Sequence, residues 1–176
     1  MHLLNETDDE LEFVAICRRV SGFTVPPGNR KDIRGFADLV RPDIMFANRR
    51  RGSTTRQTLD TALAEHGIDS LDIAGYSREQ KTDIAAAAAV RANLADTALG
   101  TAASAERLDL DLVPVGKETV FLVTINEANH PLDDLIRQIL DDTQYQDAVD
   151  AIASGHDASI AGTVLTKKDI PKARPT

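Results

Sequence analysis

The sequence is poor in several residue types, and each shortage excludes a class of protein. Its 176 residues include one cysteine, no tryptophan and only 4% aromatic side chains. Because a lone cysteine forms no internal disulfide, a disulfide-rich secreted fold is excluded, and Cys17 is expected to be a buried small hydrophobe. No apolar run approaches the roughly 20 residues of a transmembrane helix, and the N-terminus turns acidic instead of carrying a basic signal region. We therefore expect a cytoplasmic chain without membrane contact.

The charge is acidic overall but has one local exception. There are 20 Lys and Arg residues against 28 Asp and Glu residues, giving a net charge of -8. This balance argues against broad nucleic-acid binding, which needs a basic surface to neutralise phosphates. The exception is "NRRRGSTTRQTLDTAL" at residues 48–63, which contains four arginines. Three interpretations are open: a nucleic-acid patch, a site for a small anion, or a helix cap beside solvated arginines.

Hydrophobic patterning predicts alternating strands and helices. Strands are expected at 11–20, 43–49, 71–77, 110–115 and 119–125, and helices at 34–40, 55–66, 81–95, 130–140 and 145–154. Residues 166–176 are basic and contain proline, so they are expected to form a flexible tail. Strands that alternate with helices predict an α/β fold around a mainly parallel sheet.

In this pattern the segment that begins at Gly52 is a strand-to-helix turn. The first N–H groups of a helix lack internal acceptors and carry partial positive charge, so they favour an anion. Gly52 has no side chain, so an anion can approach the backbone closely there. Three residues with hydroxyl donors follow it: Ser53, Thr54 and Thr55. The segment lacks the Gly-Lys-Ser/Thr ending of a P-loop. A plain N-cap remains the alternative interpretation for the hydroxyls.

The arginines of the segment divide by position. Arg56 lies in the first helical turn, where the helix dipole favours an acidic residue. We therefore expect Arg56 to contact or support a bound anion, and Arg49 and Arg50 to meet mainly solvent. The alternative is that Arg56 pairs with Asp60, four residues further along the helix.

The same residues carry a family resemblance. The elements "GNRKDI", "NRRRGSTTR" and "GY", followed by "AAAAAVRANLADTALGTAAS", resemble the type 2 periplasmic-binding-protein-like domain. This is its cytoplasmic version, found with molybdate-responsive transcription regulators and with proteins of molybdenum-cofactor biosynthesis. The resemblance implies one domain over 1–176 with two α/β lobes, 1–20 plus 126–176 and 21–125, and a ligand between them. It also implies that the first lobe is incomplete at its N-terminus, which leaves a sheet edge open to a second copy or a partner chain.

The resemblance also implies the ligand and its contacts. Relatives bind oxyanions such as molybdate or tungstate with helix N-termini and hydroxyls. Tyr76 matches the tyrosine of the "GY" element, which implies a ligand contact. An alternative interpretation of equal weight is a buried tyrosine whose hydroxyl is hydrogen-bonded within the protein. Thr54 replaces a glycine, and Asp83 stands where relatives often have histidine, so its carboxylate either repels an anion or caps the alanine-rich helix. The residues that match the anion-facing helix start are Gly52, Ser53, Thr55 and Arg56.

Catalytic signals are weak. No serine lies in a G-x-S-x-G elbow, and the four histidines show no metal-ligand spacing. The sequence therefore predicts a non-enzymatic oxyanion-sensing domain that needs neither metal nor cofactor. No helix-turn-helix is present, so DNA contact is expected only through another polypeptide. Two alternatives remain: an effector domain for a small organic, pterin-like ligand, and an interaction domain with a degenerate cleft.

Overall fold

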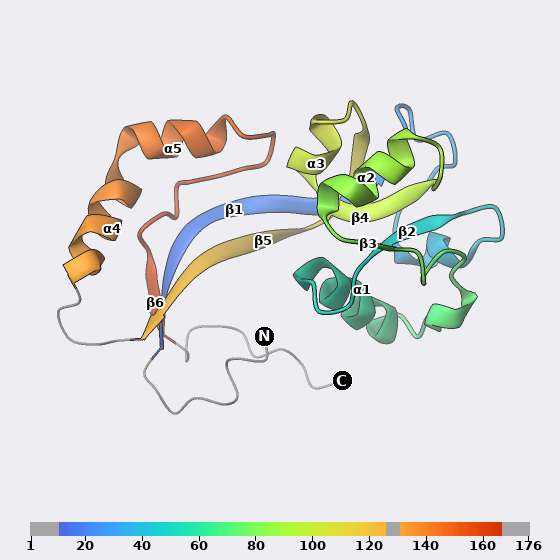
Figure 1. The fold of residues 1–176 in the computed structure, drawn as a ribbon, viewed down its shortest axis with the longest axis horizontal. Helices are drawn as coiled ribbons and strands as arrows, with labels where there is room; N and C mark the ends of the chain where they lie inside the picture. The colour runs from blue at the N-terminus through green and yellow to red at the C-terminus, as the bar shows by residue number, and fades with distance from the viewer. Residues whose placement is uncertain (1–10, 126–130, 167–176) are drawn as a thin grey trace. The chain divides into compact units, whose positions relative to one another are not determined.

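The described part of the chain, residues 11–125 and 131–166 of a computed structural model, alternates strands with helices (Figure 1). The expected tail lies almost entirely outside these residues. The strands are β1 (Leu11–Val25), β2 (Phe46–Arg49), β3 (Glu79–Gln80), β4 (Thr97–Thr101), β5 (Asp111–Ile125) and β6 (Val164–Thr166). The helices are α1 (Thr54–Glu65), α2 (Asp83–Arg91), α3 (Ala102–Glu106), α4 (Pro131–Asp141) and α5 (Thr143–Asp150), with 3-10 turns η2 (Phe36–Val40) and η3 (Ser70–Asp72).

The strands form a mixed sheet. Their order is β3-β2-β4-β1-β5, and β6 pairs with β1. β2 is parallel to both β3 and β4, whereas β1 is antiparallel to β4 and β6. The α/β fold is thus confirmed, but the expectation of a mainly parallel sheet is wrong, because parallel pairing is confined to the three strands that end in helices.

The chain divides into two compact units, and β1 and β5 belong to both. Unit 1 contains the residues up to Arg19 and those from Glu118 onward, and unit 2 is Val20–Lys117. The expected boundary at residue 125 lies eight residues beyond the observed one, because 110–115 and 119–125 belong to one continuous strand rather than two. Pro114 lies within β5, which ends the strand order, and edge strands tolerate a proline that cannot donate.

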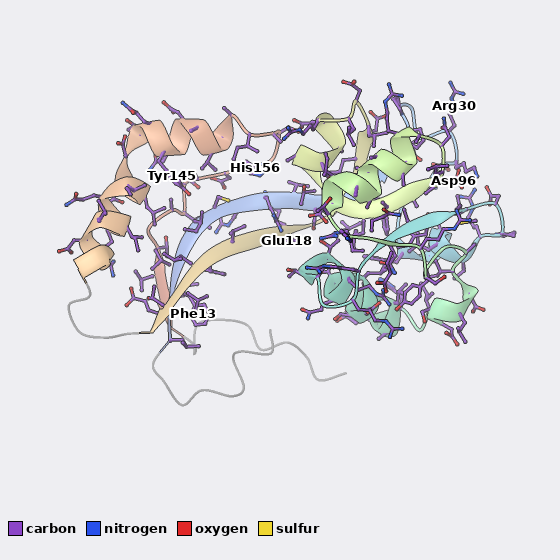
Figure 2. All side chains as sticks on the ribbon, in the orientation of Figure 1. Phe13, Arg30, Asp96, Glu118, Tyr145 and His156 are labelled. Carbon is purple, nitrogen blue, oxygen red and sulfur yellow. The ribbon has the colours of Figure 1, made fainter. Side chains whose placement is uncertain are left out.

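Unit 1 has a small core between β1 and α5. Cys17 is 7% exposed and packs with Val149 and Ala158, and burial raises the pKa of its thiol. Tyr145 points from α5 toward β1 and donates its hydroxyl to the Ile16 carbonyl at 3.1 Å (Figure 2). The expected burial of the lone cysteine is therefore confirmed.

Unit 2 packs a different helix on each face of its sheet. On one face Phe46 and Leu99 pack with Leu59 of α1. On the other face the adjacent residues, Ala47 and Ala98, pack with the alanines of α2. Since successive strand residues point to opposite faces, large side chains occupy the α1 side and small ones the α2 side. The alanine-rich helix therefore lies close to the sheet.

Three short segments depart from the sequence pattern. Residues 71–77, expected as a strand, form the end of η3 and a turn in which Gly75 has φ 90°. β4 and α3 were not assigned, because "TALGT" and "AASAE" are built from small residues with weak strand patterning. β4 nevertheless lies between β2 and β1 at the centre of the sheet.

The turn at Gly75 yields a stability prediction. A Cβ added there would lie 2.1 Å from the Phe46 carbonyl oxygen, at a φ that L side chains rarely adopt. Gly75→Ala should therefore lower the free energy of unfolding by about 2–4 kcal/mol in urea denaturation. Gly116→Ala is the matched control, since its Cβ would meet nothing within 4 Å. Equal unfolding midpoints for the two variants would contradict the prediction.

Candidate functional site

Three parallel strands of unit 2 end at one edge of the sheet, and a helix starts after each of them. α1 follows β2, α2 follows β3 and α3 follows β4. A side-chain hydroxyl caps each helix by accepting a hydrogen bond from the N–H three residues further along the chain. The capping residues are Ser53, Thr82 and Thr101. In open α/β sheets, ligands bind outside the carboxyl ends of the strands. We call this region of unit 2 the carboxyl edge.

The turn before α1 has the geometry that the sequence predicts, but some of its hydrogen-bond donors already have acceptors within the protein. Gly52 has φ 82° and open space around it. The Ser53 hydroxyl donates to the Arg50 carbonyl at 2.9 Å and accepts from the Arg56 N–H at 3.2 Å. Among the described residues, the N–H groups of Thr54 and Thr55 find no acceptor. These two N–H groups are the anion-binding capacity left at the start of α1.

Arg56 is buried and surrounded by carboxylates. Its side chain is 5% exposed, and its Nε lies 2.9 and 3.0 Å from the two oxygens of Asp60. Nη1 reaches Glu79 at 3.3 Å, and the guanidinium lies 4.2 Å from the centre of the Tyr76 ring. Burial opposes the charge, but the hydrogen bonds with Asp60 leave the pKa of Arg56 above its ordinary value. These contacts match the Asp60 alternative, so the positive charge in the first turn is balanced from within.

Tyr76 belongs to the same cluster. Its hydroxyl donates to Asp60 Oδ1 at 2.7 Å, which matches the reading of a tyrosine with a satisfied hydroxyl. Its backbone carbonyl accepts from the amide of Asn48, which is 1% exposed at the end of β2. Tyr76 therefore ties the turn before β3 to both α1 and β2.

Arg49 and Asp83 form a second pair at the carboxyl edge. Arg49 Nε lies 2.6 Å from Asp83 Oδ1, and the guanidinium also donates to the Gln80 carbonyl at 2.9 Å. The expectation that Arg49 meets solvent is wrong, since its side chain is 12% exposed. The cap interpretation of Asp83 is also wrong: Thr82 caps α2, and Asp83 instead accepts from the Thr55 hydroxyl at 3.1 Å.

The remaining cations of the carboxyl edge face solvent. Arg51 is 85% exposed and only loosely paired with Glu79, at 3.9 Å. Arg50, as expected, is exposed, as is Lys81 before α2, and neither has an ion pair within the part of the chain that the structure describes. With Arg49 and Arg56 these make five cations against the carboxylates of three residues, Asp60, Glu79 and Asp83. The carboxyl edge thus keeps a positive excess in an acidic chain.

Two residues of the site lie outside the sequence prediction. Glu79 belongs to the two-residue strand β3, which is too short to show any periodicity. Asn48 is the penultimate residue of β2, and a polar side chain beside three arginines gives no indication of its burial. The positive charges of "RRR" and the negative charge of Glu79 in "SREQK" are opposite in sign, which is a signal that could pair these two segments.

The described ranges contain neither a cluster of metal ligands nor a membrane-spanning helix. No group of three or more His, Cys, Asp or Glu side chains there is placed to hold a metal ion. No described helix is both long and apolar enough to cross a membrane.

Strand ends, helix starts and a positive edge define a ligand-binding domain, and comparison with known proteins gives its family. A family model described as the PBP superfamily domain matches residues 2–141. The chain belongs to this family, the periplasmic-binding-protein-like domains, and the resemblance to this family is confirmed.

Two relatives in sequence are both described as uncharacterized proteins. The protein YvgK of Bacillus subtilis is 29% identical over 159 residues, covering 90% of this chain and 51% of that protein. A Clostridium pasteurianum protein from the 5' region of a 2Fe-2S ferredoxin gene is 30% identical over 111 residues, covering 62% of this chain and 97% of that protein. The chain therefore spans about half the length of YvgK.

Solved structures share the fold at low identity. The ancestral amino acid-binding protein AncCDT-1, a precursor of cyclohexadienyl dehydratase, has a TM-score of 0.53 and 18% identity, covering 82% of this chain and 63% of its own. XAC2383 of Xanthomonas citri bound to ATP has a TM-score of 0.51 and 16% identity, covering 84% of this chain and 65% of its own. At these identities the likeness shows the fold alone.

The burial of Arg56 gives a stability prediction. Arg56→Gln removes a buried cation from two carboxylates and from an aromatic ring. The free energy of unfolding should fall by about 1.5–3 kcal/mol, measured by chemical denaturation. Arg50→Gln removes the same charge from an exposed position that has no ion pair within the described residues. It should change the free energy of unfolding by less than about 0.5 kcal/mol. If both variants unfold alike, the Arg56 cluster does not stabilise the fold.

Proposed function

We propose that unit 2 binds a small oxyanion at the carboxyl edge, of the molybdate or tungstate class, and carries out no chemistry on it. The protein would then act as a cytoplasmic sensor domain in regulation linked to the molybdenum cofactor. The observation that carries the proposal is the pair of N–H groups at Thr54 and Thr55 that find no acceptor within residues 11–125 and 131–166, on a helix start that follows a parallel strand. Such N–H groups, at the positive end of a helix dipole, favour a tetrahedral oxyanion.

The charge around this helix start supports the same proposal. Arg50 and Lys81 add exposed cations at the ends of β2 and β3. Exposed cations attract an anion at long range and are screened by salt. The Thr54 hydroxyl is exposed beside the two N–H groups and adds a third donor. Donors without a matching acceptor suit a ligand that only accepts hydrogen bonds.

A second candidate is a small organic ligand that carries both an anionic and a cationic group. Asp83 and Glu79 favour it, because each places a partly exposed carboxylate at the same edge as the donors. Among the similar solved structures, AncCDT-1 is described as an amino acid-binding protein, and XAC2383 is described as bound to ATP and as bound to chloride. Three such different ligands on one fold mean that the fold does not select the ligand class.

A ligand screen separates the two candidates. A ligand present at about 100 times its Kd should stabilise the folded state by about 2.7 kcal/mol, raising Tm by roughly 5–10 °C for a chain of this size. We expect molybdate or tungstate to give this shift in a thermal melt, with sulfate and phosphate weaker. A shift with amino acids or pterins and none with oxyanions would move the assignment to the organic ligand.

The helix start can be tested by removing a single N–H. Thr54 is the first residue of α1, and Ser53 before it is extended, with φ -78° and ψ 148°, so the backbone already suits a proline. Thr54→Pro deletes one N–H donor together with the hydroxyl, whereas Thr54→Ala deletes the hydroxyl alone. We expect the proline variant to bind molybdate about 1.5–3 kcal/mol more weakly than the alanine variant in calorimetric titration. Equal affinities would place the anion elsewhere.

A further inference from the structure

The carboxylate of Asp83 already occupies donors at the start of α1. One oxygen, Oδ1, accepts both from Arg49 Nε at 2.6 Å and from the Thr55 hydroxyl at 3.1 Å. The Asp83 side chain is 26% exposed and that of Arg49 only 12%. A carboxylate oxygen with two donors, one of them charged, is bound in the way that an external oxyanion would be bound.

The start of α2 does not explain this contact. Thr82 already caps the helix through the Ala85 N–H at 3.1 Å. An acidic residue in the first turn is favoured by the dipole of its own helix, but that effect does not require a side chain that reaches across to α1. The contact therefore belongs to the carboxyl edge rather than to the stability of α2.

We infer that Asp83 is an intramolecular competitor that limits the affinity of the carboxyl edge for anions. This inference rests on the proposed function. A bound oxyanion must either displace the carboxylate from Arg49 and Thr55 or lie beside a like charge, and both weaken binding. Asp83 thereby sets a threshold, so that only a ligand at high concentration or with strong acceptor oxygens fills the edge.

The test compares molybdate binding by calorimetry in the unaltered protein and in Asp83→Asn. The asparagine keeps the size of the side chain and removes its charge, so molybdate affinity should rise about tenfold. Asp72→Asn is the control for net charge, since Asp72 is exposed in η3 and its side chain makes no hydrogen bond or ion pair within the described residues. The control should stay within about twofold of the unaltered protein.

A second substitution tests the competition itself. If Asp83 holds the Thr55 hydroxyl, Thr55→Val should change molybdate affinity by less than about twofold when Asp83 is present, and should remove part of the gain in the Asp83→Asn background. Should Asp83→Asn fail to fold in a thermal melt, Asp83→Ser replaces it, because serine is well tolerated at helix starts.

The outcomes separate the inference from the proposed function. Equal molybdate affinity in Asp83→Asn and the unaltered protein overturns the inference and leaves the function standing. Weaker binding in Asp83→Asn also overturns it, because Asp83 would then support binding by holding Arg49 and Thr55 in place. Binding by Asp83→Asn alone supports the inference and refutes the function of the natural sequence. No binding by either protein overturns both.

Discussion

Burial on both faces of β2 and β4 is the constraint on which the carboxyl edge depends. The two strands are parallel and adjacent, and their alternating side chains pack against α1 on one face and against α2 on the other. Because both strands run in the same direction, the helices that follow β2 and β4 begin at the same end of the sheet. The helix starts are therefore brought together by packing of the core, and not by contacts among the polar residues of the edge.

The polar residues then settle the electrostatics of that edge. A guanidinium as buried as that of Arg56 must be paired, because an uncompensated charge in the interior is strongly unfavourable. Asp60 and Glu79 meet this requirement from α1 and β3, and Tyr76 covers the guanidinium with its ring. The cluster holds three segments of unit 2 in one arrangement. What remains for a ligand is the set of backbone donors and the exposed cations at its border.

How well a feature can be predicted from the sequence depends on how far apart in the chain the residues that form it lie. The cap at Ser53 and the φ of Gly52 are local features, and they were predictable from the order Gly-Ser-Thr-Thr before a helical pattern. The contact of Arg49 with Asp83 joins residues 34 positions apart, and it depends on the parallel pairing of β2 with β3, a strand of two residues. Pairing of this kind is set by the packed sheet, so the pattern of residues along the chain does not predict it.

Cys17 makes the two units distinguishable in solution. It is the only cysteine of the chain and lies in the core of unit 1 with 7% of its surface exposed. A thiol reagent reacts with the thiolate, which burial disfavours here by raising the pKa of the thiol. The rate of labelling at fixed pH therefore follows local opening of unit 1, and unit 2 contributes no thiol. The natural sequence thus contains its own reporter of how readily unit 1 opens.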